Sequence, residues 1–253
     1  MTRVWLITGC SRGLCLAIVE AALNVGDSVI ATARRPEQLA GLAEKYGGER
    51  VFVLALDISD NDQVIEVVKA GHDRFGRIDI VVNNAGYANP VAIEDIDIDD
   101  FRAQVDANLF GVVHVSKAAI PILRQQRSDH IFQISSVGGR LGVPGLSAYQ
   151  CAKWVVGGFS TVLVREAAPL GIKVTVVEPG GMKTDWAGSP MQIPPVSKPY
   201  ESTVGYMADM RWKNLGDEPS IPSKVASIIL RLSNEEEPPL RLLIGPDAVK
   251  HAE

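Results

Sequence analysis

Short apolar segments alternate with longer, helix-like segments along the whole chain, and this alternation restricts the possible folds more than any other feature. Strands that are buried on both faces have continuous apolar sequences. Seven segments fit that pattern: Val4–Ile7, Val29–Ala31, Val51–Leu56, Ile78–Val82, Ile131–Ile134, Lys173–Val177 and Leu240–Ile244. Helices are expected between them, at about 13–25, 36–46, 60–75, 99–127, 148–168 and 222–232. The pattern predicts an α/β fold with one doubly wound, seven-stranded parallel sheet and helices on both faces.

The 253 residues are expected to form a single domain. A hydrophobic content of 46% over this length supports one large core, and no linker, repeat or low-complexity segment divides the sequence. The segment at about 184–220 is rich in proline and too long for an ordinary connection. Because it follows the sixth strand at the carboxyl edge of the sheet, we expect it to be a lid over a binding site.

Charge and cysteine content argue against several classes of function. A formal net charge of −5, with no more than two adjacent basic residues, argues against a nucleic-acid partner. The cysteines Cys10, Cys15 and Cys151 lack the spacing of a zinc site or a disulfide framework, so no metal is expected. An apolar strand rather than a signal peptide follows Met1, and no apolar run approaches the roughly 20 residues that span a bilayer. We therefore expect a cytoplasmic protein without a membrane partner.

The turn after the first strand has the composition of a phosphate-binding loop. It reads Thr8-Gly9-Cys10-Ser11-Arg12-Gly13-Leu14-Cys15 and leads into an amphipathic helix. Glycines in such a turn let backbone amides approach a pyrophosphate, which then lies at the positive end of the helix. Two glycines alone also fit a tight turn without a ligand. The strand–turn–helix context favours a dinucleotide site of the Rossmann type.

The end of the second strand indicates which dinucleotide is bound. Rossmann folds that bind NAD have an acidic residue there, which holds the ribose 2′-hydroxyl. This chain has Arg34 and Arg35 instead, and Arg12 lies in the glycine loop. Arg34 and Arg12 offer guanidinium groups to a 2′-phosphate, although arginines at such positions also simply face solvent. We expect NADP(H), with NAD(H) as the less favoured cofactor.

Tyr149 and Lys153 form the candidate catalytic pair. Residues four apart lie on one face of a helix, so the lysine ammonium is expected near the tyrosine phenol. A free tyrosine has a pKa near 10, and a nearby positive charge lowers that pKa towards the working range. A ketone that receives a hydride also needs a proton, which this pair supplies. A tyrosine four residues before a lysine is common, so the pair needs support from its context.

Taken together, the motifs resemble the short-chain dehydrogenase/reductase family, in its standard-length branch and of the NADP-preferring carbonyl reductase type. The resemblance covers the chain from Thr2 to about Gly180, and the remainder more loosely. The motifs occur in the order of that family: Gly9 and Gly13, Asp57, Asn83-Asn84-Ala85-Gly86, Asn108, Ser136, Tyr149 with Lys153, and Pro179-Gly180.

The resemblance implies a set of catalytic roles. Tyr149 is expected to be the general acid in reduction and the general base in oxidation, and Ser136 to bind the substrate carbonyl in preference to Ser135. Lys153 is expected to bind the nicotinamide ribose and lower the pKa of Tyr149, and Asn108 to hold a water that relays protons. Ser136 also fits the simpler role of a strand-end cap, and Asn108 that of a helix-interior amide.

The resemblance also implies a cofactor site. Asp57 is expected to contact the adenine, Asn83, Ala85 and Gly86 to line the ribose side, and the segment after the sixth strand to hold the carboxamide. Asn83 and Asn84 alternatively tie adjacent strands together. The full predicted set is Gly9, Ser11, Arg12, Gly13, Leu14, Arg34, Asp57, Ile58, Asn84, Ala85, Gly86, Tyr149, Lys153, Pro179, Gly180, Met182 and Thr184.

Cys15 departs from the family pattern, which usually has a third glycine at this position. That glycine permits close packing of the first helix against the strand and cofactor. We favour a tolerated or engineered substitution, which puts cofactor affinity but not the fold in doubt. A redox-sensitive thiol is the alternative, because helix N-termini lower the pKa of thiols.

The predicted substrate pocket is mainly apolar. We expect it to be bounded by Tyr87, Val137, Gly138, Val143, Trp186 and Met191, although Trp186 and Met191 alternatively pack the lid against the body. No arginine or lysine is obviously placed to bind a substrate carboxylate. The pattern favours a neutral, hydrophobic ketone, aldehyde or alcohol.

Analogy with the family implies a homodimer or homotetramer, paired through the helices at about 99–127 and 148–168. A non-catalytic NADP(H)-sensing protein is the main alternative function, but such proteins typically lack the tyrosine or the lysine. Enoyl-thioester reductases resemble a pattern with wider tyrosine–lysine spacing. Extended epimerases have a different glycine spacing and a longer C-terminal domain.

Overall fold

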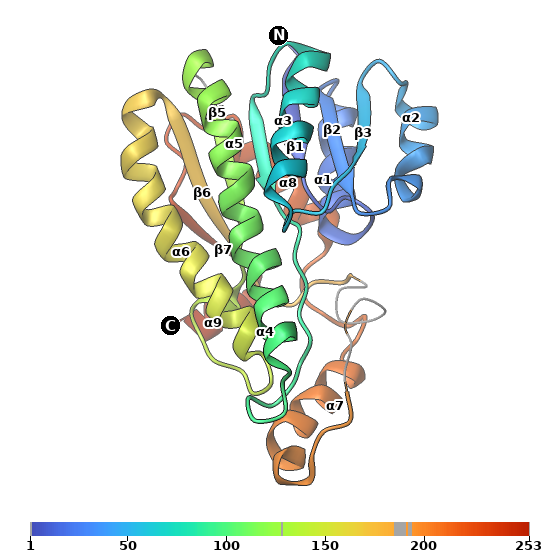
Figure 1. Cartoon of the computed structure of the whole chain (residues 1–253), viewed down its shortest axis with the longest axis vertical. Helices are drawn as coiled ribbons and strands as arrows, with labels where there is room; N and C mark the ends of the chain where they lie inside the picture. Colours follow the sequence, from blue (N-terminus) through green and yellow to red (C-terminus); the bar gives the residue numbers. More distant parts are fainter. Residues whose placement is uncertain (1, 128, 185–190, 192–193, 253) are drawn as a thin grey trace.

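The computed structural model describes residues 2–127, 129–184, 191 and 194–252. Figure 1 shows one sheet with helices on both sides. The strands are β1 (Val4–Ile7), β2 (Ser28–Ala33), β3 (Val51–Ala55), β4 (Ile80–Asn83), β5 (Asp129–Ile134), β6 (Ile172–Pro179) and β7 (Arg241–Ile244). The α-helices of the described residues are α1 (Gly13–Asn24), α2 (Ala40–Tyr46), α3 (Asn61–Phe75), α4 (Ile98–Val105), α5 (Gly111–Gln126), α6 (Ser147–Ala167), α7 (Tyr206–Lys213), α8 (Pro222–Leu232) and α9 (Pro246–Ala252).

The seven strands are parallel and lie in the order β3-β2-β1-β4-β5-β6-β7. The predicted doubly wound, seven-stranded sheet is therefore confirmed. β1 pairs with both β2 and β4, so the direction of winding reverses between β1 and β4. Ligands of open α/β sheets bind at such a switch point, outside the carboxyl ends of the strands.

Alternate residues of the strands point into two separate cores, as the period of two of a β-strand requires. In β1, Trp5 and Ile7 pack with α1 and α8, whereas Val4 and Leu6 pack with α3, α5 and α6. Figure 1 shows α3, α5 and α6 on the near side of the sheet, with α1 and α8 behind it. Within the described residues, no helix is long and apolar enough to cross a membrane.

Several helices differ from the sequence-based prediction. The helix expected at 99–127 is α4 and α5 joined by a π-helical turn, Asp106–Phe110. The one expected at 36–46 begins with a 3-10 turn, Pro36–Leu39, before α2. The irregular segment at 184–220 contains α7, and α9 was not predicted at all.

A buried carboxylate joins the last strands to the loop after β5. Glu178 of β6 is fully buried and accepts hydrogen bonds from Arg140 at 2.7 and 2.9 Å. Its other oxygen accepts from Arg241 of β7. A buried carboxylate needs such partners because an unpaired buried charge is strongly destabilising. The network fixes the loop that follows Ser136.

His130 of β5 is buried as a neutral ring. The hydroxyl of Thr175 donates to the carbonyl of Pro239 and therefore accepts from His130 Nε2, at 2.9 Å. The ring of Phe132 packs against it, with centroids 3.9 Å apart. Burial, and then the charge of Lys173, lower the pKa of His130 to about 3.

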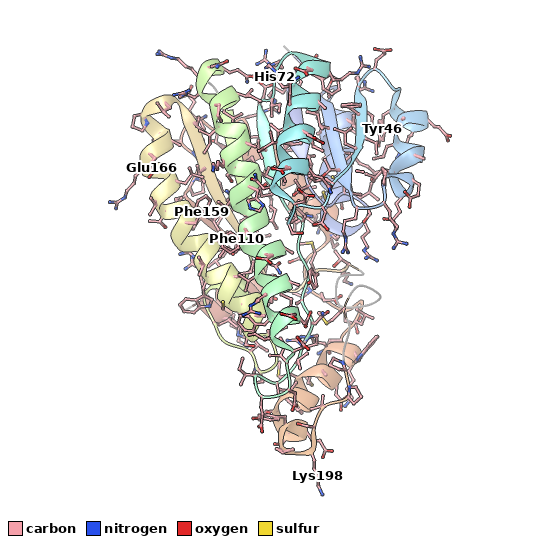
Figure 2. All side chains as sticks on the ribbon, viewed as in Figure 1. Tyr46, His72, Phe110, Phe159, Glu166 and Lys198 are labelled. Carbon is pink, nitrogen blue, oxygen red and sulfur yellow. The ribbon has the colours of Figure 1, made fainter. Side chains whose placement is uncertain are left out.

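Acid should therefore destabilise the fold through His130. The ring is protonated near pH 6.5 in the unfolded chain but only at about pH 3 in the folded chain. The neutral, buried ring therefore contributes its full stability above pH 6.5, and this contribution is lost as the pH falls towards 3. In urea denaturation, the unfolding free energy of wild type should fall as the pH is lowered from 7 to 4. His130→Gln should reduce the slope of this fall by up to about 1.4 kcal/mol per pH unit. His72→Gln, on the surface of α3 (Figure 2), is the matched control. Parallel curves for wild type and His130→Gln would contradict this account.

Candidate active site

A cavity of about 890 Å³ opens at the carboxyl edge of the sheet. It is lined by every residue of the predicted cofactor set, and by Asn108, Ser136, Tyr87, Val137, Gly138 and Val143. Met191 instead packs with Ala88, Leu146 and Tyr149 in a small apolar cluster. Trp186 lies outside the described residues.

The glycine loop after β1 is held tightly against the segment after β4. Gly9 has a positive φ of 76°, and a Cβ atom there would lie 2.8 Å from the Cα of Ala85, so only glycine fits. The hydroxyl of Thr8 accepts hydrogen bonds from the amides of Asn84 and Ala85, at 3.1 and 3.2 Å. These contacts leave the amino end of α1 facing the cavity, where it favours an anion.

Asn83 does not line the cavity, contrary to the family-based expectation. Its side-chain amide donates to Ser116 and to Gln133, at 3.1 and 2.8 Å. Asn83 therefore ties β4 to β5 and α5, which is the structural alternative left open by the sequence.

Cys15 fits the space usually occupied by glycine without disturbing the fold. Its thiol is buried and lies 3.2 Å from the carbonyl of Thr8 and 2.9 Å from the sulfur of Cys10. Burial, and then the bond to Cys10, raise the pKa of the Cys15 thiol well above its usual value. Because redox-sensitive thiols are typically exposed and have a lowered pKa, the buried Cys15 thiol favours a tolerated substitution.

The adenosine side of the predicted site is basic at its rim. Arg12, Arg34, Arg35 and Gln38 line this part of the cavity, and the side chains of Arg12 and Arg34 are exposed. Asp57 accepts hydrogen bonds from the amide and hydroxyl of Ser59, at 3.0 and 2.6 Å, which fixes the turn after β3.

Tyr149 and Lys153 lie at the amino end of α6 and are both buried. The ammonium of Lys153 donates to the carbonyl of Ile134, at 2.8 Å, and lies 5.6 Å from the centre of the Tyr149 ring. Burial lowers the pKa of Lys153 to about 8. The predicted pair is therefore assembled, with its lysine anchored to the end of β5.

The groups that act on the Tyr149 hydroxyl differ in part from those expected. Burial raises the pKa of Tyr149 to about 12, while a hydrogen bond with Ser136 and the charge of Arg211 act in the opposite direction. Lys153 remains near the phenol, 5.6 Å from the ring centre, while its ammonium donates to Ile134. The charge of Arg211, which the sequence did not reveal, also acts on Tyr149.

The two serines after β5 are engaged differently. The hydroxyl of Ser135 donates to the carbonyl of Lys153, at 3.2 Å, and so joins the strand to α6. The hydroxyl of Ser136 accepts from the amide of Gly138, at 3.0 Å, and shares a hydrogen bond with Tyr149. Ser136 is thus the serine placed beside the tyrosine.

Asn108 lies in the π-helical turn between α4 and α5, a feature frequent at functional sites. Its amide nitrogen donates to the carbonyls of Tyr87 and Gln104, at 2.7 and 2.8 Å. Its oxygen is buried and, among the described residues, has no hydrogen-bond partner. A Cβ atom on Gly86 would lie 2.4 Å from this oxygen and 3.7 Å from the Lys153 nitrogen, so glycine keeps a passage open between them.

The loop after β6 is supported by a residue that sequence reasoning missed. Asp247, at the start of α9, accepts a hydrogen bond from the amide of Gly181 at 2.6 Å. A Cβ atom on Gly180 would lie 2.3 Å from the same carboxylate. The only sequence signal is an acidic residue in the first turn of a short helix, which does not reveal a contact with the distant loop.

Further cavity residues were also missed. Gln150 accepts a hydrogen bond from the amide of Val143, at 2.7 Å, and shapes the wall beside Tyr149. In and just after α7, Met207, Met210, Arg211 and Asn214 line the cavity. Their spacing of three and four residues is a helical face that the sequence contains, but proline content concealed a helix here. The sequence suggested no arginine on the substrate side of the cavity, but Arg211 lines it.

Comparison with known proteins gives a consistent picture. Residues 3–192 match the family model described as short chain dehydrogenase. "Oxidoreductase BOA17" of Botryotinia fuckeliana is 68% identical over 252 residues, which cover 100% of this chain and 92% of that protein. A short-chain dehydrogenase structure from Streptomyces avermitilis is 36% identical with a TM-score of 0.91, covering 100% of this chain and 92% of that one.

Less similar solved structures hold either cofactor. ElxO with NADP bound is 26% identical with a TM-score of 0.81, covering 99% of this chain and 100% of that one. A protein from Burkholderia phymatum in complex with NAD, 19% identical with a TM-score of 0.88, covers 99% of this chain and 92% of that one, and shares the fold.

Proposed function

This protein belongs to the short-chain dehydrogenase family, and we propose that it is an NADP(H)-dependent oxidoreductase that interconverts a ketone or aldehyde with an alcohol. One observation carries the proposal. A single cavity at the switch point of the sheet contains the glycine loop at one side and Ser136, Tyr149 and Lys153 at the other. The arrangement suits a carbonyl reductase, with Tyr149 as general acid and base.

The residues present fit a nicotinamide dinucleotide. Gly9, Gly13 and the amino end of α1 would hold its pyrophosphate, and Asp57 and Ile58 its adenine. Asn84, Ala85, Gly86 and Lys153 would lie along the ribose, with Pro179, Gly180, Met182 and Thr184 at the carboxamide. When bound, the nicotinamide supplies or accepts the hydride.

The protein's own part is to move one proton at the substrate oxygen. Ser136 and Tyr149 share a hydrogen bond and can both reach a carbonyl oxygen placed in the cavity. In reduction the Tyr149 hydroxyl gives its proton to that oxygen, and in oxidation the phenolate takes it back. Lys153, with a pKa of about 8, and the Asn108 oxygen, which no described residue hydrogen-bonds, form the inner end of a route for replacing the proton.

Arg34 and Arg12 support a preference for NADP(H) over NAD(H). Where NAD-binding Rossmann folds have a carboxylate, this chain has Arg34, whose guanidinium can form two hydrogen bonds to a phosphate. The acidic residue that would favour a free 2′-hydroxyl is missing from the sequence that directly follows β2.

We also propose a homo-oligomer that pairs through the α4–α5 and α6 surfaces. Phe110, labelled in Figure 2, is 47% exposed, and Trp154, Val155 and Val162 of α6 are about half exposed. Apolar residues gathered on neighbouring helices are typical of a subunit interface. Dimer or tetramer is a question for solution measurement, and the cytoplasmic location remains a prediction.

The general-acid role predicts that Tyr149→Phe abolishes turnover. With NADPH and a panel of aryl ketones, diketones and ketosteroids, the variant should lose at least about 100-fold in kcat, since a positioned acid contributes about that much. NADPH binding, measured by fluorescence, should stay nearly unchanged. Tyr46→Phe, in α2 and away from the cavity, is the matched control. Full activity in Tyr149→Phe would refute the mechanism, and tight NADPH binding without any turnover in wild type would favour the sensor.

The cofactor assignment predicts a selective defect in Arg34→Gln. The lost guanidinium–phosphate contact should weaken NADPH binding by about 10- to 100-fold and leave NADH binding little changed. Arg231→Gln, an exposed arginine of α8, controls for the change in net charge. An equal loss for both cofactors, or tighter NADH binding by wild type, would contradict the assignment.

A further inference from the structure

Arg211 lies where a catalytic cavity of this kind has no general need for an arginine. It projects from α7, near the end of the chain segment that was expected to be a lid, and lines the cavity that also contains Ser136 and Tyr149. Its side chain belongs to neither the glycine loop nor the basic rim at Arg12 and Arg34. We therefore expect Arg211 to bind a ligand group other than the 2′-phosphate.

The guanidinium of Arg211 has an unused hydrogen-bond donor. Its Nη1 atom is buried and has no hydrogen-bond partner within the described part of the chain. Glu218 also lines the cavity, but its carboxylate accepts from the amide of Gly216, at 2.9 Å. A buried donor without an acceptor costs about 1–3 kcal/mol, and more when it is charged. An anionic ligand in the cavity would relieve this cost.

Arg211 also faces Tyr149. Its positive charge lowers the pKa of the Tyr149 hydroxyl, and Tyr149 in turn raises the pKa of Arg211, which burial lowers. Both effects describe one interaction, between the Arg211 guanidinium and the Tyr149 phenol, and both residues line the same cavity. A ligand in this cavity can therefore meet both the Tyr149 hydroxyl and the Arg211 guanidinium.

Apolar side chains line the cavity near each of these groups. Val143 and Leu146 pack in one cluster with Tyr149, and Met207 and Met210 line the cavity from the same helix as Arg211. Such walls suit a hydrocarbon or aryl body and strengthen a charge-assisted hydrogen bond, because they exclude water. A guanidinium matches the two-pronged geometry of a carboxylate or a phosphate. Because Arg12 and Arg34 already line the part of the cavity predicted to hold the cofactor phosphates, we infer a carboxylate at Arg211.

We propose that Arg211 binds the carboxylate of the substrate, which is therefore an oxo acid with an apolar body or the corresponding hydroxy acid. This inference rests on the proposed oxidoreductase function and replaces the expectation of a neutral substrate. Carbonyl reduction itself is unchanged: the carbonyl carbon gains a hydride, its oxygen gains the Tyr149 proton, and the carboxylate remains intact.

Paired acids and esters test the proposal. Benzoylformate, benzoylacetate and benzoylpropionate, which place the carboxylate at three distances from the carbonyl, are each compared with their methyl ester as substrates with NADPH. Wild type should prefer at least one acid over its ester. Arg211→Met should lower kcat/KM by about 10- to 100-fold more for that acid than for its ester, chiefly through KM, because only the acid loses the guanidinium–carboxylate contact. Loss of the positive charge near Tyr149 should change kcat for acid and ester alike.

Three controls separate this role from others. Lys213→Met removes an exposed cation from the same helix and should leave the acid–ester ratio unchanged, while Arg211→Lys should retain part of it. Unchanged NADPH binding in Arg211→Met excludes a contact with a cofactor phosphate. An equal loss for acid and ester in Arg211→Met, or no preference in wild type, would overturn the proposal.

Failure of the proposed function would look different. If wild type reduces the esters but shows no preference for acids, the reductase assignment stands and the role of Arg211 falls. If wild type binds NADPH yet reduces no carbonyl compound, the proposed function is wrong. In that case phenylglyoxal modification tests the anion site by itself. The site exists if added acids protect Arg211 from modification, and it does not exist if they fail to protect it.

Discussion

The parallel pairing of β1 with β4 is the constraint on which the rest of the site depends. All seven strands end at the same edge, and α1, which follows β1, packs on the opposite face of the sheet from α5, which follows β4 and α4. The turns after the two strands therefore separate and open a space between them. Contact between Gly9 and Ala85, and the hydrogen bonds of Thr8, fix how far these turns separate.

The chemical groups are placed by α6 and its contacts with β5. Lys153 donates a hydrogen bond to the carbonyl of Ile134, and Ser135 donates one to the carbonyl of Lys153. These two hydrogen bonds join α6 to the end of β5. Tyr149, one turn earlier, is thereby held beside Ser136. Burial opposes the ionisation of both Tyr149 and Lys153, and this makes the local charges decisive for the proton transfer.

The sequence alone predicted those features of the fold and the site that depend on residues close together in the chain. Continuous apolar runs predicted every strand, and the motifs from Gly9 to Thr184 predicted residues that the structure brings into one cavity. Apart from Asn108, these residues lie in or shortly after a strand, or on the first turns of a helix. Their positions follow once the sheet is parallel.

The remaining features depend on contacts between distant segments, which a single sequence does not specify. Asn108, in the π-helical turn, donates to the carbonyl of Tyr87 and lies against Gly86, and Asp247 meets Gly181 only because α9 folds under the loop after β6. Arg211 was overlooked because its segment was read as an irregular lid. The burial of Cys15 beside Cys10 likewise reversed the direction expected for its pKa.

Transfer of isotope from the cofactor tests the central claim most directly. NADPH that carries deuterium at the reactive carbon of the nicotinamide, on either face in separate samples, is incubated in ordinary water with the carbonyl compound that the enzyme reduces best. The account predicts that one of the two samples gives an alcohol with a single deuterium on the carbinol carbon, as seen by NMR and mass spectrometry. An alcohol free of deuterium in both samples would show that its hydrogen comes from solvent and would contradict direct hydride transfer.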